Sequence, residues 1–323
     1  SNYQKELMEK TGSKTNNDKL TPHLMKHDNY VLHYRNVKFI NSLGVKITMK
    51  RVIEFKQSNW MSEYINENNK LRTQAKQEGN EFLVSLFKLL NNSVFGKTCE
   101  DVRNRENMHL TTDPKNAIKW MSKLEFKYAN YVDGLYLIQT HKTQIVYDKP
   151  MYVGCCILDL SKVRMLDFHY NTMEKHHKYK YNLIYSDTDS LVYHVKHENF
   201  HQWMKDNPDE FDLSNMDDKY KVKDNYQVLG KMKSEVGSKV ITEFLALSPK
   251  SYAYKYADKE TKNAKGLSLA VSDKTMNFDD YHRTLLNQSI QTRPIYNIRS
   301  FNQQLFTTLE DKVALSAWYD KNV

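Results

Sequence analysis

The chain has 323 residues, enough for one large domain or two smaller ones. Its 48 Lys and Arg against 39 Asp and Glu give a formal net charge of +9, which favours a polyanionic partner such as nucleic acid. Only three cysteines occur and two are adjacent, which excludes a disulfide scaffold, and no apolar run reaches the ~18 residues that span a bilayer. We therefore expect an intracellular protein from a reducing compartment, with no membrane partner.

The first hundred residues change from a strand-like to a helix-like pattern. Tyr30 to Phe55 mixes β-branched and aromatic runs, which predicts a strand, a short helix and a second strand. From Trp60 to Gln77 polar helix formers follow, and Gly79 and Asn80 then stand as a stop and a cap. A second helix is expected from Glu81 to about Val94, so the segment predicts an αα-hairpin.

Short strand-like runs follow in the middle of the sequence. Residues 128–132 and 135–140 flank Asp133 and Gly134, a pair typical of a tight β-hairpin turn. A third strand-like run spans residues 144–153.

Helical patterns then surround a second β-hairpin candidate. Residues 158–177 predict an amphipathic helix, with candidates for its buried side at Leu158, Val163, Leu166 and Tyr170. After residue 196 the patterns predict a helix, several strand-like pieces up to residue 254, and a polar, mostly helical tail.

The run from Tyr181 to Val195 has β-formers on both sides of Ser-Asp-Thr-Asp-Ser, which predicts a hairpin with Asp187 and Asp189 at its tip. Two carboxylates on one face would repel each other unless a divalent cation lay between them. Magnesium prefers carboxylate oxygens and keeps water and phosphate as its other ligands. The pattern therefore suits phosphoryl transfer with two metal ions.

The sequence YSDTDS, Tyr185 to Ser190, resembles the Y-x-D-T-D-S motif of family B DNA polymerases. In that family the two aspartates hold the catalytic magnesium ions. The resemblance implies two Mg²⁺ ions at Asp187 and Asp189, with Asp189 as the more direct ligand, and places Tyr185 and Thr188 against DNA.

A second segment, KLLNNSVFG, resembles the K-x-x-x-N-S-x-Y-G motif on the fingers helix of the same family. Helical spacing puts Lys88, Asn92 and Phe95 on one narrow face, where the resemblance implies binding of the incoming nucleotide. Ser93 and Gly96 would let the nascent base pair approach closely. Phe95 stands where the family usually has Tyr, so we expect altered nucleotide discrimination.

On the preceding helix, Arg72 and Lys76 form an i, i+4 pair. They face the same triphosphate, or they are two solvated charges on an exposed helix. The two interpretations carry equal weight.

A third segment, SPKSYAYK, resembles the K-x-Y segment through which family B polymerases contact the primer strand. Lys250 and Tyr252 occupy the matching positions and share one face of a strand. Lys265 lies in a basic stretch that we interpret as the start of a thumb gripping duplex DNA, with a solvated loop as the alternative.

Two further segments, residues 158–170 and 228–237, look like segments of protein-primed polymerases, especially those of Maverick or Polinton transposons. The resemblance implies an α+β right-hand fold with an antiparallel palm sheet, helical-hairpin fingers and a mostly helical thumb. It divides the chain into palm (1–57), fingers (58–98), palm again (99–254) and thumb (255–323). Residues 103–150 are either an insertion or a plain palm hairpin.

The implied function is template-directed DNA synthesis on primer-template DNA from deoxynucleoside triphosphates, started from a terminal protein primer, at a nuclear or viral replication site. Residues 1–57 contain no segment like the D-x-x-S-L-Y that carries another carboxylate of the family, and no exonuclease. We therefore expect the C-terminal part of a longer protein, with little or no polymerisation by the isolated chain.

Three other interpretations stay open at this point. A D-x-D pair also occurs in nucleotide-sugar glycosyltransferases, and an inactive, nucleic-acid-binding remnant of a mobile element would keep the same motifs. His197, Glu198 and His201 form the H-E-x-x-H pattern of zinc peptidases. Asn199 stands where a packing residue is expected and a strand precedes closely, so a solvated helical turn is favoured over zinc.

Overall fold

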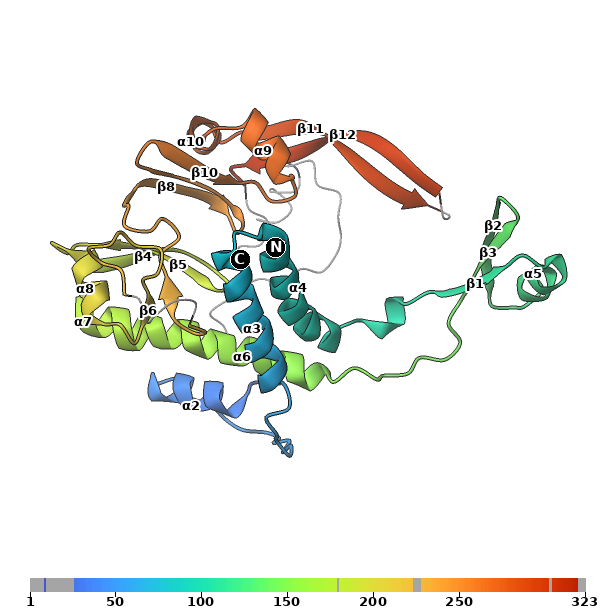
Figure 1. Ribbon diagram of the computed structural model, residues 1–323, viewed down its shortest axis with the longest axis horizontal. Helices are drawn as coiled ribbons and strands as arrows, with labels where there is room; N and C mark the ends of the chain where they lie inside the picture. Colours follow the sequence, from blue (N-terminus) through green and yellow to red (C-terminus); the bar gives the residue numbers. More distant parts are fainter. Residues whose placement is uncertain (1–8, 10–25, 179, 223–227, 302–303, 319–323) are drawn as a thin grey trace. The chain divides into compact units, whose positions relative to one another are not determined.

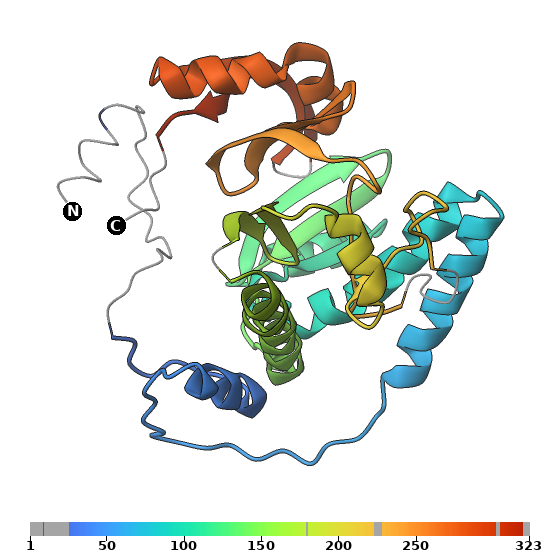
Figure 2. The ribbon, with the colours of Figure 1, turned by 90° about the vertical axis from the view of Figure 1, so that its left-hand side faces the viewer.

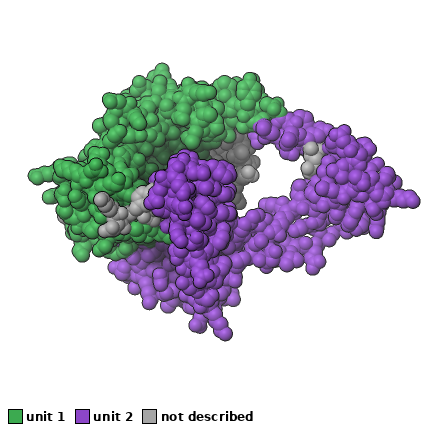
Figure 3. Space-filling model, in the orientation of Figure 1, with its two compact units in different colours: residues 1–30, 164–297, 307–323 green, residues 31–163, 298–306 purple. Residues whose placement is uncertain are grey.

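The computed structural model describes Glu9 and residues 26–178, 180–222, 228–301 and 304–318. It divides into two compact units, shown in Figure 3. Unit 1 comprises Ser1–Tyr30, Arg164–Asn297 and Thr307–Val323, and unit 2 comprises Val31–Val163 and Ile298–Phe306. Apart from Glu9, the part of the expected palm before residue 26 lies outside the described residues.

Unit 2 contains several helices and one small three-stranded sheet, next to which α5 lies (Figure 1). Its helices are α2 (Tyr34–Ser42), α3 (Ser62–Gln77), α4 (Glu81–Thr98), η1 (Val102–Asn104), α5 (Pro114–Met121) and the first part of α6 (Met151–Asp167). Its strands are β1 (Asn107–Thr111), β2 (Phe126–Val132) and β3 (Leu135–Thr140).

The predicted αα-hairpin is confirmed: α3 and α4 lie side by side (Figures 1 and 2). Gly79 ends α3 with a φ of 70°, a left-handed conformation that glycine adopts without steric cost. The Asn80 side chain then caps α4 by accepting a hydrogen bond from the Leu83 backbone N–H at 3.1 Å. Between the helices, the Asn68 amide donates to Asn91 Oδ1 at 2.9 Å.

The predicted hairpin at residues 128–140 is also confirmed, as strands β2 and β3 of an antiparallel sheet with the order β1-β3-β2. Asp133 and Gly134 both have positive φ, 48° and 84°, as a type I′ turn requires. Helix α5 packs against this sheet, and His109 of β1 stacks on Trp120 with 3.6 Å between ring centroids.

Two strand predictions in unit 2 are wrong. Helix α2 lies within the segment from residue 30 to 55, but within residues 26–59 no strand forms, and none forms within residues 144–150. Residue 151 already begins α6. β-Branched composition alone does not make a strand, because a strand needs a neighbour for its backbone hydrogen bonds.

Unit 1 combines short helices with antiparallel strands. Its helical elements are the end of α6, the π-helix η2 (Phe168–Glu174), α7 (Lys175–His177), α8 (Phe200–Asp206), α9 (Leu269–Thr275) and α10 (Phe278–Leu286). Its strands are β4 (Tyr181–Asp187), β5 (Ser190–Val195), β6 (Phe211–Asp212), β7 (Met232–Lys233), β8 (Ile241–Ser248), β9 (Ser251–Tyr256) and β10 (Lys259–Asn263), together with most of β11 (Ile290–Phe301) and β12 (Gln304–Ser316).

Two apolar clusters hold unit 1 together. One packs α9 and α10 against one face of the β10-β9-β8 sheet, around the fully buried Ala253 and Tyr281. The other packs η2 and α8 around the β4–β5 hairpin, with Phe168, Met173 and Leu213 at its centre. The antiparallel pairs β4–β5 and β8–β9–β10 agree with the expected α+β class, while β6 and β7 pair in parallel over two residues.

The expected mostly helical thumb is wrong. Within residues 255–323, α9 and α10 span 7 and 9 residues, whereas β11 and β12 span 12 and 13. From Thr307 to Val313 the side chains of β12 alternate between exposed and half-buried, the period of two that marks a strand. The described helices do not combine the length and apolar character needed to cross a membrane.

The predicted helix at residues 158–177 is confirmed, but its buried side is not. Leu158 and Tyr170 are 43% and 41% exposed, and Val163 and Leu166 are half-buried. The buried positions of α6 are Gly154 and Asp159. From Phe168 the helix widens to π geometry, so residues after that point leave the 3.6-residue period on which the prediction relied.

Candidate active site

The acidic hairpin forms as expected. β4 ends at Asp187, β5 begins at Ser190, and these two residues pair with each other. The two-residue connection is tight: Thr188 has a φ of 53°, and the Asp189 backbone N–H donates to the Asp187 carbonyl at 2.6 Å. This i to i+2 pattern is that of a γ-turn, and it brings both aspartates to the tip of the hairpin.

A second tight turn lies against the first. Strands β8 and β9 are joined by Pro249 and Lys250, and Lys250 has a φ of 64°. The Lys250 backbone N–H donates to the Tyr185 hydroxyl at 2.8 Å. The Tyr185 ring also packs against Phe244 and Tyr252, with centroids 5.6 and 5.2 Å apart. The K-x-Y turn and the acidic turn, 63 residues apart in sequence, therefore form one site.

An ion pair connects the two turns at their polar ends. The Lys250 ammonium lies 2.8 Å from both carboxylate oxygens of Asp187, and the Thr188 hydroxyl donates to Asp187 Oδ1 at 3.0 Å. Asp187 raises the pKa of the Lys250 ammonium, while burial raises the pKa of the Tyr185 hydroxyl. Both carboxylate oxygens of Asp187 thus have a partner within the protein, whereas Asp189 is exposed.

The donor atoms at this tip suit magnesium, because carboxylate and hydroxyl oxygens are its preferred protein ligands. Within the described ranges, no group of three or more His, Cys, Asp and Glu side chains comes together. Magnesium is often held by one or two carboxylates and completed by water and substrate phosphates, so Asp187 and Asp189 fit such an ion.

Tyr252 belongs to an aromatic face of the β8–β9–β10 sheet. Phe244 stacks on Tyr252 and Tyr254 at 5.9 and 6.2 Å, and Tyr254 lies 5.8 Å from Tyr256. These rings are half-exposed, whereas Ala253 on the opposite face is buried against the helices. Sequence reasoning found Tyr252 but missed the rest, although alternate tyrosines on one strand were a visible signal.

The predicted nucleotide-binding residues lie in unit 2. Lys88 and Asn92 are exposed on α4, and Phe95 is half-buried. The Ser93 hydroxyl is occupied by its own helix, donating to the Leu89 carbonyl at 2.6 Å. Gly96 is exposed, and apart from its chain neighbours and the backbone of its own helix, no atom of the described chain lies within 4 Å of the position that a Cβ would take.

On α3, Lys76 is exposed and Arg72 is half-buried. Arg72 Nε is buried and lacks a hydrogen-bond partner within the described part of the chain. An unpaired guanidinium donor suits an anionic ligand better than it suits a purely solvated side chain. Lys265 is exposed in the turn after β10 in unit 1.

Gly154 of α6 is a supporting residue that sequence reasoning missed. A Cβ there would come within 2.1 Å of Cys99 Sγ, 2.6 Å of Thr98 Oγ1 and 3.7 Å of the Phe95 ring. Only glycine lets α6 approach the end of α4 so closely. The signal was a glycine inside a helical pattern, where glycine is otherwise unfavourable.

The H-E-x-x-H residues do not share a helix. Asn199 is the N-cap of α8, so His201 lies in the helix while His197 and Glu198 precede it. His197 and Glu198 line a shallow pocket of about 500 Å³ with Lys180 and Lys196. The arrangement lacks the two histidines on one helical face that the zinc peptidase pattern requires.

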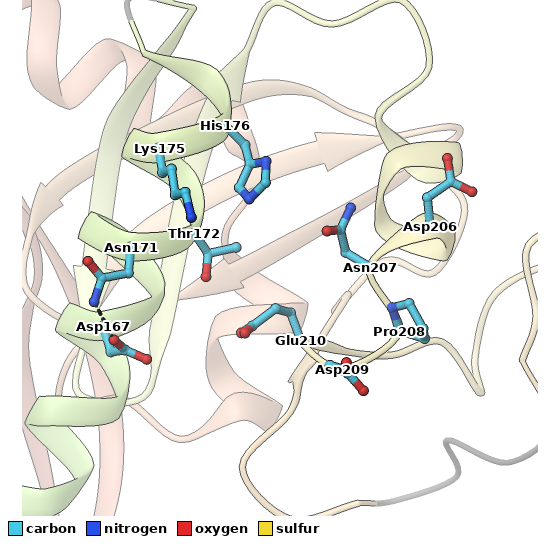
Figure 4. A pocket seen from close by; sticks show the side chains of 10 residues that line it. All are labelled: Asp167, Asn171, Thr172, Lys175, His176, Asp206, Asn207, Pro208, Asp209 and Glu210. Carbon is cyan, nitrogen blue, oxygen red and sulfur yellow. Dashed lines mark hydrogen bonds between the residues drawn. The ribbon is translucent and has the colours of Figure 1, made fainter.

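A second pocket of unit 1, about 350 Å³, lies between η2 and the segment after α8 (Figure 4). Asn171, Thr172 and Lys175 face it from the helix, and residues 206–210 face it from the other side. None of the residues predicted for metal, nucleotide or DNA binding in a polymerase lines either pocket. The acidic turn is an exposed tip rather than a cavity, as a large polymeric substrate would permit.

Comparison with protein families supports a polymerase assignment. Residues 5–165, which are 161 of the 323 residues and just short of half, match the family described as DNA polymerase type B, organellar and viral. The match includes KLLNNSVFG but ends before the acidic hairpin. No curated protein and no solved structure matches the chain. The match does not favour the glycosyltransferase or the inactive remnant.

Proposed function

Taking the chain as a type B DNA polymerase of the organellar and viral kind, we propose that it adds deoxynucleotides to a primer 3′-hydroxyl at the acidic turn of unit 1. The observation that carries this proposal is the contact between two turns distant in sequence. Tyr185 and Asp187 of one turn bind Lys250 of the other, so carboxylates for metal and a cation for the primer lie together. Neither motif alone would support this as strongly.

Asp187 and Asp189 would hold two magnesium ions, which supply positive charge to the attacking and leaving oxygens when bound. The carboxylates orient that charge at the end of a rigid hairpin, whose strands pair along β4 and β5. Lys250 and Tyr252 would contact the primer strand next to them, through a charge and a ring respectively.

Lys88 on α4 would bind the triphosphate of the incoming nucleotide. Asn92 and Phe95 are within two helical turns of it on the same face. The unpaired Nε of Arg72 supports a second anion contact from α3, with Lys76 one turn further along. Phe95 keeps an aromatic surface for the nascent base pair but has no hydroxyl to offer.

Initiation from a terminal protein is the finer part of the proposal, and the likeness to protein-primed transposon polymerases supports it. A primer hydroxyl supplied by a protein requires the same two carboxylates and the same nucleotide contacts. Extension of a DNA primer therefore tests the site independently of the priming mode.

The test is Asp189→Asn in the full-length protein, measured as extension of a primed template with all four deoxynucleoside triphosphates. We expect extension to fall at least about a hundredfold, because a charge that stabilises the transition state is lost. Binding to primer-template DNA, measured by fluorescence anisotropy, should change little.

Asp258→Asn is a matched control. Asp258 is the exposed second residue of the two-residue β9–β10 turn, and it follows Ala257 at a φ of 47°, as Asp189 follows Thr188. Its substitution should leave extension unchanged. Undiminished extension by Asp189→Asn, or sugar-nucleotide turnover that requires Asp187 without DNA extension, would overturn the proposal.

A further inference from the structure

The Lys250 ammonium forms an ion pair with Asp187, although the proposed function requires the ammonium to contact the primer and the carboxylate to bind a metal ion. Its Nζ lies 2.8 Å from each carboxylate oxygen, a symmetrical contact that occupies the side of Asp187 facing the K-x-Y turn. A divalent cation bound by the same oxygens would compete with an ammonium at that distance.

The backbone of Lys250 is held in place, whereas its side-chain ammonium is accessible to solvent. The Lys250 N–H is held by the Tyr185 hydroxyl, and the left-handed φ of 64° fixes the turn. The Lys250 side chain is 55% exposed, whereas that of Asp187 is 21% exposed. The long lysine stem can therefore swing from the carboxylate to another anion while its backbone stays in place.

The anion next to it would be the primer. Tyr252 lies on β9, two residues after Lys250, and belongs to the aromatic face of the β8–β9–β10 sheet. The Tyr185 ring packs against it. A primer DNA strand running along that face would bring one of its phosphates within reach of Lys250. Asp187 and the primer phosphate thus become alternative partners of one ammonium group.

We propose that Lys250 is a resident counter-ion that neutralises Asp187 in the metal-free protein and transfers to the primer strand when a divalent ion takes its place. The inference rests on the proposed function of the same site. It makes metal binding and primer binding cooperative, because each event removes a competitor of the other.

Such coupling must be reciprocal. If a divalent ion releases Lys250 for the primer, the primer must raise the affinity for the ion by the same factor. Exposed ion pairs contribute modestly, so the expected factor is about two- to fivefold. Lys250→Met keeps an unbranched side chain only one atom shorter, and the backbone N–H, but removes the charge.

The experiment measures Mn²⁺ binding by electron paramagnetic resonance, and primer-template affinity with and without Mn²⁺ at constant ionic strength, in the full-length protein. Lys250→Met should bind Mn²⁺ about two- to fivefold more tightly in the absence of DNA. It should also lose the gain in DNA affinity that Mn²⁺ gives the wild type. Lys255→Met is the control, because Lys255 lies on β9, the strand that follows Lys250, and its ammonium pairs with Glu243 at 3.2 Å.

Asp187→Asn provides a second readout that needs no metal. It frees Lys250, so its metal-free affinity for primer-template DNA should rise to the level that the wild type reaches with Mn²⁺. An affinity that stays at the metal-free wild-type value would overturn the exchange even if Lys250→Met did not fold.

The outcomes separate this inference from the proposed function. Mn²⁺ binding that is lost in Asp187→Asn but equal in Lys250→Met and wild type overturns the counter-ion role alone. Wild-type protein that binds no Mn²⁺, or binds it equally with Asp187 and Asp189 both replaced by Asn, overturns the metal site and the exchange together.

Discussion

Gly154 and Gly96 offer a direct test of how α6 packs against α4. Both are glycines inside helices of unit 2, so replacement by alanine gains the same ~0.5–1 kcal/mol of backbone entropy at each. At Gly96 nothing lies within 4 Å of the new Cβ. At Gly154 the Cβ would lie 2.1 Å from Cys99 Sγ and 2.6 Å from Thr98 Oγ1.

The clash at Gly154 is not relieved easily. The Thr98 hydroxyl is held by the Phe95 carbonyl at 2.7 Å, and a β-branched side chain has few rotamers to choose from. Overpacking of this kind costs about 1–3 kcal/mol. We therefore expect Gly96→Ala to stabilise the protein by about 0.5–1 kcal/mol, and Gly154→Ala to lie about 1–3 kcal/mol below it.

Urea denaturation followed by circular dichroism measures both variants, with stability taken from the midpoint at constant slope. Cys99→Ala in the Gly154→Ala background removes the nearer clashing atom and should recover part of the loss, a coupling that a double-mutant cycle isolates. Equal free energies of unfolding for Gly154→Ala and Gly96→Ala would refute the close approach of α6 to α4.

Three further predictions concern single side chains. Thr188→Asn should stabilise the protein by about 0.5–1 kcal/mol, because a positive φ is sterically less favourable for a β-branched residue than for Asn. Urea denaturation measures the change, and a loss of stability would contradict this prediction. Arg105 holds the pKa of Glu100 down to about 2, so the stability this pair adds is present above pH 4.5 and is lost as the pH falls towards 2. Carboxyl NMR should show that titration, and an ordinary Glu100 pKa would refute it. Burial, and to a lesser extent the hydrogen bond to Glu174, raises the pKa of Tyr181 to about 12. The stability that the protonated hydroxyl contributes is therefore present below pH 10 and is lost as the pH rises towards 12. NMR of labelled tyrosine should show a higher Tyr181 pKa in the wild type than in Glu174→Gln.

Sequence patterns predicted the elements whose ends are set by local chemistry. The β2–β3 hairpin follows from Asp133 and Gly134, because only a few residue types accept positive φ at both turn positions. The α3–α4 hairpin follows from Gly79 and from the Asn80 cap. The acidic hairpin was predicted over residues 181–195 with both aspartates at its tip, because apolar runs border a short polar segment; the strands extend further into that segment, to Asp187 and from Ser190.

Patterns failed where a distant part of the chain decides the outcome. Residues 45–56 have strand-like composition but join none of the sheets of the described chain, whereas β11 and β12 are strands that pair with each other. On α6 the buried residues are a glycine and an aspartate, since the helix approaches α4 at Gly154 and Asp159 accepts the His33 backbone N–H at 2.6 Å. Hydrophobic periodicity cannot reveal a face chosen for close approach or for a hydrogen bond.

The site shows the same division at the level of single residues. Motif resemblance found Asp187 and Lys250 separately, and each was assigned its own ligand, a metal ion for one and a primer for the other. The structure pairs them at 2.8 Å, a contact between residues 63 positions apart that neither motif contains. If the Lys250 ammonium exchanges between Asp187 and a primer phosphate, as proposed above, the two assignments imply that metal and primer bind cooperatively. The pairing therefore turns two independent residue assignments into one statement about the order and energetics of binding, and the Mn²⁺ dependence of primer affinity measures it directly.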